Sequence, residues 1–398
     1  MAEQIIRVAG RGDGVTASGR HVPWAAPGDS VDETGVVTPG PHHQDPACPH
    51  FPRCGGCQLQ HLDDAAYSSF IVDRIAGALH AQGLTTDIRP PLLSPHRSRR
   101  RAALHAERKG SRVVLGFSEA GSHALVDVTA CAVLDPDLFA AIAPLRRLLD
   151  VLMTGKRRVE IKLTRVDQGV DIVVFGVEAT GLPAAEAIAD FAGEHGVARL
   201  SIDTGLGPET RWEPQGVTVT LGGAAVPFPP ASFLQATPEG EAALIAAVQA
   251  AIGPARTVAD LFTGLGTFAL ALTPRAKVYA AEAGRDAFMA LKSGAALAQR
   301  PVFAEHRDLF RRPLSAAELD RFDAIVLDPP RAGAREQAIN LADSKVGVIA
   351  YVSCNPGTFS RDAQTICEGG YSLNWVQPVG QFRWSTHVEL VAQFTRQG

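Results

Sequence analysis

The chain has 398 residues, of which 46% are hydrophobic and 20% are charged, and its net charge is -4. This length allows two or three domains with cores of their own, and the composition is that of an ordinary globular protein. The weakly acidic balance excludes nucleic-acid binding through the overall charge, so an RNA contact requires a local basic patch. The N-terminus has no apolar signal segment, and no apolar stretch is long enough to span a bilayer. We therefore expect a cytoplasmic protein without a membrane partner, and we predict a monomer.

The first 40 residues are predicted to form a small β-barrel. Short strand signals run from residue 5 to 38, and Gly10, Gly12 and Gly14 recur at alternate positions, as in tight bends between short strands. Residues 39–47 (Pro-Gly-Pro-His-His-Gln-Asp-Pro-Ala) indicate a linker. A helix is expected from about residue 64 to 82, because its apolar side chains fall on one face. These side chains are Tyr67, Phe70, Ile71, Ile75 and Leu79.

Three cysteines follow the linker in a Cys-x5-Cys-x2-Cys pattern. They are Cys48, Cys54 and Cys57, and Cys131 can complete a set of four. Structural disulfides are not expected in a cytoplasmic protein. Four thiolates suit either a zinc ion or an iron–sulfur cluster, and the spacing does not separate the two. Chemistry alone favours zinc, and Cys367, on a predicted helix, is expected to be inert.

The middle of the chain, from about residue 90 to 235, is predicted to be a sheet-rich domain. Strand signals recur at 112–117, 159–163 and 170–175. A run of cations lies at its beginning: Arg97, Arg99, Arg100, Arg101, Arg108, Lys109 and Arg112. Most such runs are solvated faces. For a protein that acts on RNA, a phosphate-binding surface is the better interpretation of such a run.

Beyond residue 257, apolar strands alternate with helical stretches. Thr237-Pro238-Glu239 first marks a helix start, with a capping hydroxyl and a proline in the first turn. The strands are expected at 257–262, 276–281, 323–327, 346–352 and 388–394. This alternation predicts an α/β fold with a doubly wound, mostly parallel sheet. Ligands of such sheets lie outside the carboxyl ends of the strands.

The first of these strands leads into a glycine-bearing loop, residues 260–268 (Asp-Leu-Phe-Thr-Gly-Leu-Gly-Thr-Phe). Gly264 and Gly266 allow a close approach of a ligand to the backbone, although the loop has neither a full GxGxxG nor a Walker lysine, and a plain turn is the alternative. Glu282 ends the next strand, where a carboxylate can accept ribose hydroxyls. Asp308 follows the third strand, where it can accept the adenine amino group. Each acid alone is explained equally well by a helix cap; together, after the glycine loop, they favour a methyltransferase cofactor site.

Three further residues form a possible catalytic set. Asp328 begins a rigid Asp-Pro-Pro-Arg loop, Cys354 ends the next strand, and Glu389 follows His387 near the C-terminus. A rigid turn and a small buried cysteine are the alternatives, but a thiol between a strand end and a helix start is expected to have a lowered pKa. Carbon 5 of uracil becomes nucleophilic after a thiolate adds to carbon 6, and a base must later remove the carbon-5 proton. Cys354 is the candidate thiolate, Glu389 the base, and Asp328 the partner of the polar edge of the pyrimidine.

These residues resemble the RNA 5-methyluridine methyltransferase family, a class I S-adenosylmethionine-dependent family. The matching segments are residues 232–235 (Ser-Phe-Leu-Gln), 260–268, 328–331 (Asp-Pro-Pro-Arg), 353–358 (Ser-Cys-Asn-Pro-Gly-Thr) and 387–389 (His-Val-Glu). The resemblance implies that Cys354 is the nucleophile and Glu389 the proton acceptor. It implies cofactor contacts from Gln235, Phe262, Thr267, Glu282, Asp308 and Asp328. Two departures are Thr263, where the family usually has cysteine, and Thr267, where asparagine is also common.

The same resemblance bears on the rest of the chain. Ribosomal members of the family carry a four-iron four-sulfur cluster on this cysteine pattern, which implies that Cys48, Cys54, Cys57 and Cys131 hold such a cluster, with zinc as the alternative. The N-terminal stretch resembles the RNA-binding TRAM barrel. We therefore expect a TRAM-like domain at 1–40, a central domain with the cysteines at 41–235 and a methyltransferase domain at 236–398.

The function predicted is methylation of carbon 5 of a uridine in 23S ribosomal RNA through a covalent cysteine–uracil adduct. The main alternative is the same reaction on transfer RNA. A non-catalytic RNA-binding protein is less consistent with the presence of both Cys354 and Glu389. An amino-group methyltransferase prefers an aromatic residue after Asp-Pro-Pro, where Arg331 stands, and has no use for a thiolate. A radical enzyme would require a tighter cysteine triplet and a barrel fold.

Overall fold

A computed structural model describes residues 2–397, which form two compact units. Unit one contains the residues up to 70, residues 95–218 and residues 382–386. Unit two contains residues 71–94, 219–381 and those from 387 onward. Among residues 2–397, no helix is both long enough and apolar enough to cross a membrane.

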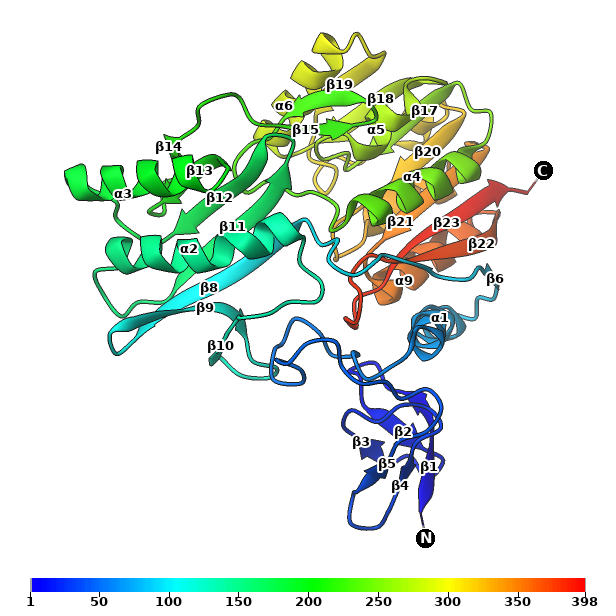
Figure 1. Cartoon of the computed structure of the whole chain (residues 1–398). Coiled ribbons are helices and arrows are strands. Elements are labelled where there is room, and N and C mark those ends of the chain that lie inside the picture. Colours follow the sequence, from blue (N-terminus) through cyan, green and yellow to red (C-terminus); the bar gives the residue numbers. More distant parts are fainter. Residues whose placement is uncertain (1, 398) are drawn as a thin grey trace. The chain divides into compact units, whose positions relative to one another are not determined.

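Unit one begins with a five-stranded antiparallel sheet in the order β3-β2-β1-β4-β5, which curls on itself (Figure 1). Its strands are β1 (Glu3–Val8), β2 (Gly14–Thr16), β3 (His21–Val22), β4 (Ser30–Val31) and β5 (Val37–Thr38). A small core of Ile5, Val22, Ala25 and Val31 lies inside the curl. Gly14 is required here, because a Cβ at this position would lie 2.6 Å from the carbonyl oxygen of Ala25. The short strands therefore form a small curled sheet, as expected, and TRAM identity stays a proposal.

Helix α1 (Asp64–His80) follows the cysteine segment. Tyr67, Phe70, Ile71, Ile75 and Leu79 are all buried, which confirms the apolar face predicted for this helix. The helix ends two residues earlier than predicted. The chain turns at Gly83, whose backbone N–H donates to the carbonyl of His80 and whose φ is 71°.

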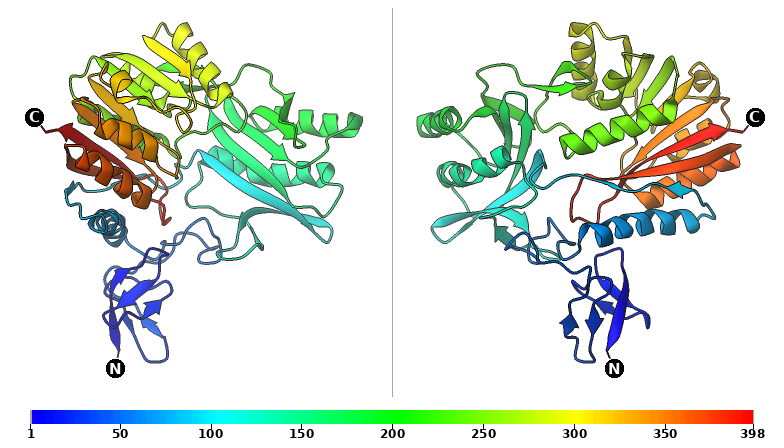
Figure 2. Two further views of the ribbon diagram at one scale, coloured as in Figure 1. Left: turned by 180° about the vertical axis from the view of Figure 1, so that it is seen from behind. Right: turned by 45° about the vertical axis from the view of Figure 1, so that its right-hand side comes forward.

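The rest of unit one is a seven-stranded sheet in the order β10-β9-β8-β11-β12-β13-β14. Its strands are β8 (Arg101–Lys109), β9 (Arg112–Ser118), β10 (Leu125–Asp127), β11 (Val159–Val166), β12 (Gly169–Phe175), β13 (Val197–Asp203) and β14 (Pro208–Trp212). Neighbouring strands are antiparallel except β12 and β13, which the crossover helix α3 (Gly181–Glu194) connects. Helix α2 (Pro136–Leu152) packs beside α3 on the sheet (Figure 2), and both contribute to its aliphatic core.

Unit two contains the larger sheet, in the order β19-β18-β17-β20-β21-β23-β22-β6, with β7 also pairing β22. Its strands are β6 (Asp87–Ile88), β7 (Leu92–Leu93), β17 (Thr257–Leu261), β18 (Lys277–Glu282), β19 (Val302–His306), β20 (Ala324–Leu327), β21 (Val348–Ser353), β22 (Tyr371–Gly380) and β23 (Glu389–Arg396). The hairpin of β15 (Thr218–Leu221) and β16 (Ala224–Pro227) comes between β7 and β17 along the chain. The helices are α4 (Pro238–Ile252), α5 (Thr267–Leu272), α6 (Arg285–Leu297), α7 (Ala316–Leu319), α8 (Arg335–Ala342) and α9 (Pro356–Glu368).

The pairing of this sheet determines where a ligand binds. Strands β17 to β21 are parallel, and β17 lies between β18 on one side and β20 on the other. The strand order therefore reverses at β17, and a ligand is expected at the carboxyl ends of β17 and β20. Helices α4 and α9 cover opposite faces of the sheet (Figure 2). The predicted doubly wound, mostly parallel sheet is thus confirmed, with β23 as the antiparallel exception.

Candidate active site

The glycine loop that follows β17 is held by a buried carboxylate. Asp260 accepts a hydrogen bond from the Thr263 hydroxyl at 2.6 Å and one from the backbone N–H of Ala269 at 2.8 Å. Complete burial raises the pKa of Asp260 to about 7. Thr263, noted as a departure from the family pattern, therefore has a local role: its hydroxyl anchors the loop.

Left-handed backbone gives the same loop its shape. Phe262, Gly264 and Gly266 have φ values of 64°, 58° and 95°, and for this reason β17 ends at Leu261, one residue earlier than predicted. A Cβ at Gly266 would lie 2.4 Å from the Leu291 side chain, whereas at Gly264 no described atom lies within 4 Å of that point. The loop thus packs closely at Gly266 and is open at Gly264, where a ligand can approach the backbone.

The two acids predicted to bind the cofactor also cap backbone turns. Glu282 accepts the backbone N–H of Gly264 at 2.8 Å through one oxygen and that of Gly284 at 2.6 Å through the other. Asp308 accepts the backbone N–H of Phe310 at 3.0 Å. Both carboxylates therefore bond backbone N–H groups of turns, but neither caps a helix, since α6 begins after Gly284 and α7 after Ser315. Each carboxylate oxygen has two lone pairs, so binding of hydroxyl or amino groups remains open to both residues.

An aromatic residue that the sequence interpretation missed lies at this loop. The ring centroids of Phe310 and Phe262 are 5.3 Å apart, and 52% of Phe310 is exposed. Its position two residues after Asp308 was the available signal. The pair presents a partly exposed aromatic surface next to the glycine loop.

Gln235 is buried just before helix α4. The side chain of Gln381 donates to the side-chain oxygen Oε1 of Gln235 at 2.9 Å and accepts the backbone N–H of Ala236 at 2.8 Å. The helix start predicted at Thr237 is confirmed, because its hydroxyl accepts the backbone N–H of Gly240 and Pro238 is the first helical residue. Gln381 therefore fixes the segment that carries Gln235.

The three predicted catalytic residues come from neighbouring strands. Asp328 directly follows β20, Cys354 directly follows β21, and Glu389 begins β23. β20 and β21 are parallel, and β23 runs antiparallel to β21, with Ser353 opposite Leu390. The carboxyl ends of two strands and the start of the third therefore meet at one edge of the sheet.

The electrostatics of these residues show that they lie close together. Burial raises the pKa of Asp328 well above its ordinary value, and the carboxylates of Glu389 and Asp260 raise it further. Burial, Glu389 and Asp328 raise the pKa of the Cys354 thiol to about 11. The expectation of a lowered thiol pKa at a helix start was wrong for the protein without bound ligands. Burial and two nearby carboxyl groups outweigh the helix start.

Arg331 opposes these carboxyl groups, and the sequence interpretation gave it no role. Its guanidinium lies at the thiol, where its charge and hydrogen bond lower the pKa of Cys354. It also donates to Nδ1 of His387 at 2.9 Å. Its backbone carbonyl accepts the side chains of Asn355 at 3.0 Å and Thr358 at 3.1 Å. Arg331 thus connects the three catalytic loops.

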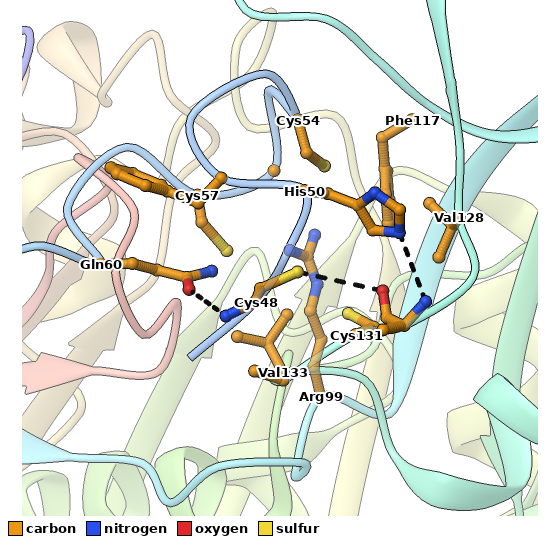
Figure 3. Close-up of a pocket in the computed structure, with 14 residues that line it drawn as sticks. Cys48, His50, Cys54, Cys57, Gln60, Arg99, Phe117, Val128, Cys131 and Val133 are labelled. Atoms are coloured by element: carbon orange, nitrogen blue, oxygen red, sulfur yellow. Dashed lines mark hydrogen bonds between the residues drawn. The ribbon is translucent and has the colours of Figure 1, made fainter. Parts of the chain in front are cut away.

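The four predicted metal-ligating cysteines come together in unit one. Cys48, Cys54, Cys57 and Cys131 line one pocket, and Figure 3 shows their sulfur atoms turned toward a shared space. The pocket is closed by His50, whose ring accepts the backbone N–H of Thr129 at 3.0 Å. Among residues 2–397, no three His, Cys, Asp or Glu side chains form a group that could hold a metal ion as they stand.

The charge in this pocket comes from the thiols and from Arg99. Burial raises the pKa of Cys57 to about 12 and also raises the pKa of Cys54 and Cys131, and nearby thiols add to each of these shifts. The guanidinium of Arg99, which lines the same pocket, lowers the pKa of all three. The pocket therefore combines several potential anions with one enclosed cation.

The basic run does not form one surface. Arg99 belongs to the cysteine pocket, Arg108 pairs with Asp150 at 2.6 Å, and Lys109 pairs with Glu107 at 3.0 Å. Side chains of a strand alternate between its two faces, which divides a run that is continuous in the sequence. A phosphate-binding role stays a prediction for the exposed members Arg97, Lys109 and Arg112.

Comparisons with known proteins point to one kind of enzyme. Residues 231–396 match the tRNA (Uracil-5-)-methyltransferase family. The chain is 51% identical to an uncharacterized RNA methyltransferase of Zymomonas mobilis, over 99% of this chain and 100% of that protein. It is 32% identical to the 23S rRNA (uracil(1939)-C(5))-methyltransferase RlmD of Pectobacterium atrosepticum, over 90% of this chain and 82% of that protein. The structure is similar to that of Pyrococcus abyssi tRNA (uracil-54, C5)-methyltransferase in complex with S-adenosyl-L-homocysteine, with a TM-score of 0.76, 21% identity and coverage of 99% and 100% of the two chains.

Proposed function

This chain belongs to the RNA uracil-5-methyltransferase family, and we propose that it methylates a uridine of 23S ribosomal RNA through a covalent adduct on Cys354. The prediction of an S-adenosylmethionine-dependent RNA uracil-C5 methyltransferase is confirmed by its relatives. The ribosomal target, the adduct and the roles of individual residues are the proposal. Its main support is the meeting of Asp328, Cys354 and Glu389 at one edge of the sheet, beside the glycine loop.

The proposed reaction begins with the sulfur of Cys354. The thiol first releases its proton to solvent water, and the thiolate then forms a bond to carbon 6 of uracil. The electrons of the carbon 5–carbon 6 double bond move toward the carbon-4 carbonyl, and the ring becomes an enolate. Arg331 favours the thiolate, because its guanidinium lies at the sulfur. Asp328 is held toward its protonated form, since its pKa is raised, and a protonated acid can donate a hydrogen bond to a uracil carbonyl.

Bound S-adenosylmethionine supplies an electrophilic methyl group to carbon 5. The carbon-5 proton must then leave, and Glu389 is the proposed acceptor because its carboxylate lies close enough to perturb the pKa of the Cys354 thiol. Loss of that proton restores the ring double bond and releases the sulfur from carbon 6. The products are 5-methyluridine, S-adenosylhomocysteine and the free enzyme.

The loops after β17, β18 and β19 are the proposed cofactor site. Left-handed glycines leave the backbone open at one point, carboxylates end successive strands, and an aromatic pair lies beside them. These features suit an adenine ring and a ribose diol. The proposed cofactor contacts are Gln235, Phe262, Gly264, Gly266, Thr267, Glu282, Asp308 and Asp328.

We propose a four-iron four-sulfur cluster at Cys48, Cys54, Cys57 and Cys131. The fit rests on four thiols around one pocket and on the guanidinium of Arg99 there, which balances part of the negative charge of a thiolate-bound cluster. Ligation requires deprotonated thiols, so metal binding displaces the protons that burial otherwise retains. A zinc ion is the alternative occupant. The proposed methyl transfer involves no redox step, so the cluster has a structural role in this proposal.

The substrate is tested by mapping 5-methyluridine in a strain that lacks the gene. We expect one uridine of 23S rRNA to lose its methyl group while transfer RNA stays unchanged, and the purified protein should restore the mark on the unmodified rRNA. Loss of the mark from transfer RNA alone would contradict the ribosomal target and leave the reaction class intact. The predicted cytoplasmic location and monomeric state are tested by fractionation and by sedimentation.

A further inference from the structure

The short connection between β22 and β23 joins, along the chain, residues that contact the cysteine-bearing segment to residues of the proposed active site. Residues 382–386 (Phe-Arg-Trp-Ser-Thr), here named the strap, group with unit one, although Gln381 and His387 on either side group with unit two. The strap thus packs with the cysteine-bearing unit while its flanking residues lie among the residues of the proposed active site.

The loop that carries Cys54 and Cys57, here named the cysteine loop, is joined to the strap by backbone hydrogen bonds. The carbonyl oxygen of Trp384 accepts the backbone N–H of Gln58 at 2.8 Å and that of Leu59 at 2.9 Å. Gln58 directly follows Cys57, a proposed cluster ligand. The side-chain amide of Gln58 also donates to the backbone carbonyl of Gly55 at 2.6 Å, and this bond braces the loop between Cys54 and Cys57. The strap is therefore bonded to the residue next to the cysteine pocket.

A buried tyrosine adds two bonds from α1. The hydroxyl of Tyr67 donates to the carbonyl oxygen of Phe382 at 3.0 Å and lies 3.4 Å from that of Ser385. Tyr67 has no exposed surface. If the strap moved away, the buried Tyr67 hydroxyl would lose its carbonyl acceptors, and water could not replace them at low cost. These bonds therefore hold the strap at Phe382 and at Ser385.

Side chains hold the strap as well. Trp384 is only 1% exposed and has a φ of 59°, a left-handed conformation that a bulky residue keeps only where its surroundings enforce it. Its ring lies 4.6 Å from that of His96. The guanidinium of Arg99, which lines the cysteine pocket, lies 5.5 Å from the ring of Phe382. Arg383 forms an ion pair with Asp64.

On each side the strap continues directly into residues that hold the active site. Gln381, one residue before it, bonds Gln235 and Ala236. His387, one residue after it, accepts a hydrogen bond from Arg331. Glu389 follows two residues later, so three peptide units separate the proposed base from the end of the strap.

We propose that the strap is a positioning device: the metal-bound cysteine loop fixes it through Gln58, Leu59 and Tyr67, and the fixed strap sets the place of Glu389. This rests on the proposed function, because it takes Glu389 as the base and Cys57 as a cluster ligand. The cluster then serves catalysis without changing its oxidation state. It keeps the loop rigid, and the loop limits how far the carboxylate moves from carbon 5. Gln58, Tyr67 and Trp384 are positioning residues, since they act through Glu389.

The test compares two buried tyrosines whose hydroxyls both donate to a backbone carbonyl, one at the strap and one away from it. Tyr371 has a further partner in the Ser344 hydroxyl at 3.1 Å. Tyr67→Phe removes a buried hydroxyl that faces two carbonyls of the strap. Tyr371→Phe, the matched control, removes a buried hydroxyl that donates to Val346 at 2.8 Å and lies 3.4 Å from the carbonyl of Ser344. For Tyr67→Phe we expect amide hydrogen exchange in residues 383–389 to be about five- to tenfold faster, as for one lost hydrogen bond. Release of the RNA adduct should slow by a similar factor, with KM for S-adenosylmethionine unchanged, and Tyr371→Phe should change neither quantity.

Removal of the cluster provides the second arm. Anaerobic chelation of iron from the wild-type protein should accelerate exchange over the same residues. Gln58→Ala should do so as well, which keeps the test valid should Tyr67→Phe fail to fold. Unchanged amide hydrogen exchange after iron removal would overturn the positioning role. Faster exchange confined to residues up to Thr386, together with a normal rate of adduct release, would overturn it as well. Adduct trapping by Glu389→Gln tests the proposed function separately: if it fails, the base assignment falls, and hydrogen exchange alone decides whether the strap is held.

Discussion

Burial affects the thiol of Cys354 as well as the thiols of the four-cysteine pocket, but the neighbours at these two places differ. Burial raises the thiol pKa at both, to about 11 at Cys354 and to about 12 at Cys57. At Cys354, the carboxyl groups of Glu389 and Asp328 raise the thiol pKa further. At Cys57, the neighbouring thiols raise it further. In the proposed function, the thiol among carboxyl groups stays largely protonated until the reaction begins, whereas the thiols around one pocket exchange their protons together for a metal. The proposal thus takes the neighbours of a cysteine, more than its burial, as what separates the nucleophile from the ligands.

The largest effect is expected at the nucleophile. Cys354→Ala should lower methyl transfer by roughly 10⁴-fold or more, because the covalent step has no other nucleophile. Binding of S-adenosylmethionine should stay close to that of the wild type, since the thiol acts only on uracil. Transfer of a tritiated methyl group and equilibrium dialysis measure the two quantities. Cys367→Ala, on helix α9, is the matched control and should keep full activity; near-normal turnover by Cys354→Ala would refute the adduct.

The next effect sharpens the roles of the two carboxyl groups. Glu389→Gln should slow turnover by about 10²- to 10⁴-fold, because the carbon-5 proton then lacks its acceptor. Methylation itself should proceed, so a protein–RNA adduct resistant to denaturation should accumulate, and gel electrophoresis under denaturing conditions detects it. The same adduct should not form in the double variant with Cys354→Ala. Normal product release without an adduct would remove Glu389 from its proposed role.

The pH dependence tests the electrostatic side of the comparison. A thiol pKa of about 11 in the protein without ligands predicts that the rate of adduct formation rises from pH 7 to 9, as the thiolate fraction grows. Arg331→Met should raise the thiol pKa further and lower the rate at pH 7 by about tenfold, which corresponds to one pKa unit. Single-turnover rates at several pH values measure both effects. A rate that is flat between pH 7 and 9, in both proteins, would contradict a protonated resting thiol.

The smallest effect on methyl transfer is expected at the other thiols. Cys57→Ser should lower turnover by less than about tenfold, through the strap, while it destabilises unit one by about 2 kcal/mol or more, since a structural metal site contributes folding free energy. Thermal unfolding followed by circular dichroism measures the stability. The wild-type protein, purified without oxygen, should be brown and contain iron and sulfide with little zinc. A colourless protein with one zinc ion would overturn the cluster, and cycling of its oxidation state during turnover would refute a structural role.

The comparison also shows where prediction from the sequence succeeded. The glycine loop, the acids at the ends of β18 and β19 and the helix start at Thr237 were predictable, because each follows from neighbouring residues and from a regular alternation of strands and helices. The order of the motifs also predicted the family. Where the expectation failed, as for the pKa of Cys354, the deciding groups come from other strands.

By itself, the sequence predicted the family, most strands of the C-terminal sheet and the candidate catalytic side chains, because these predictions depend on local patterns and on the order of motifs along the chain. It did not predict β22 (Tyr371–Gly380). Only the tertiary structure decided what those side chains face. It placed Phe310 against Phe262, Arg331 beside His387 at a separation of 56 residues, and the carbonyl of Trp384 against Gln58. Such contacts depend on the pairing of distant strands and on the course of loops, and a loop sequence does not specify its partner. For that reason the strap, which lies in no motif, became visible only in the folded chain.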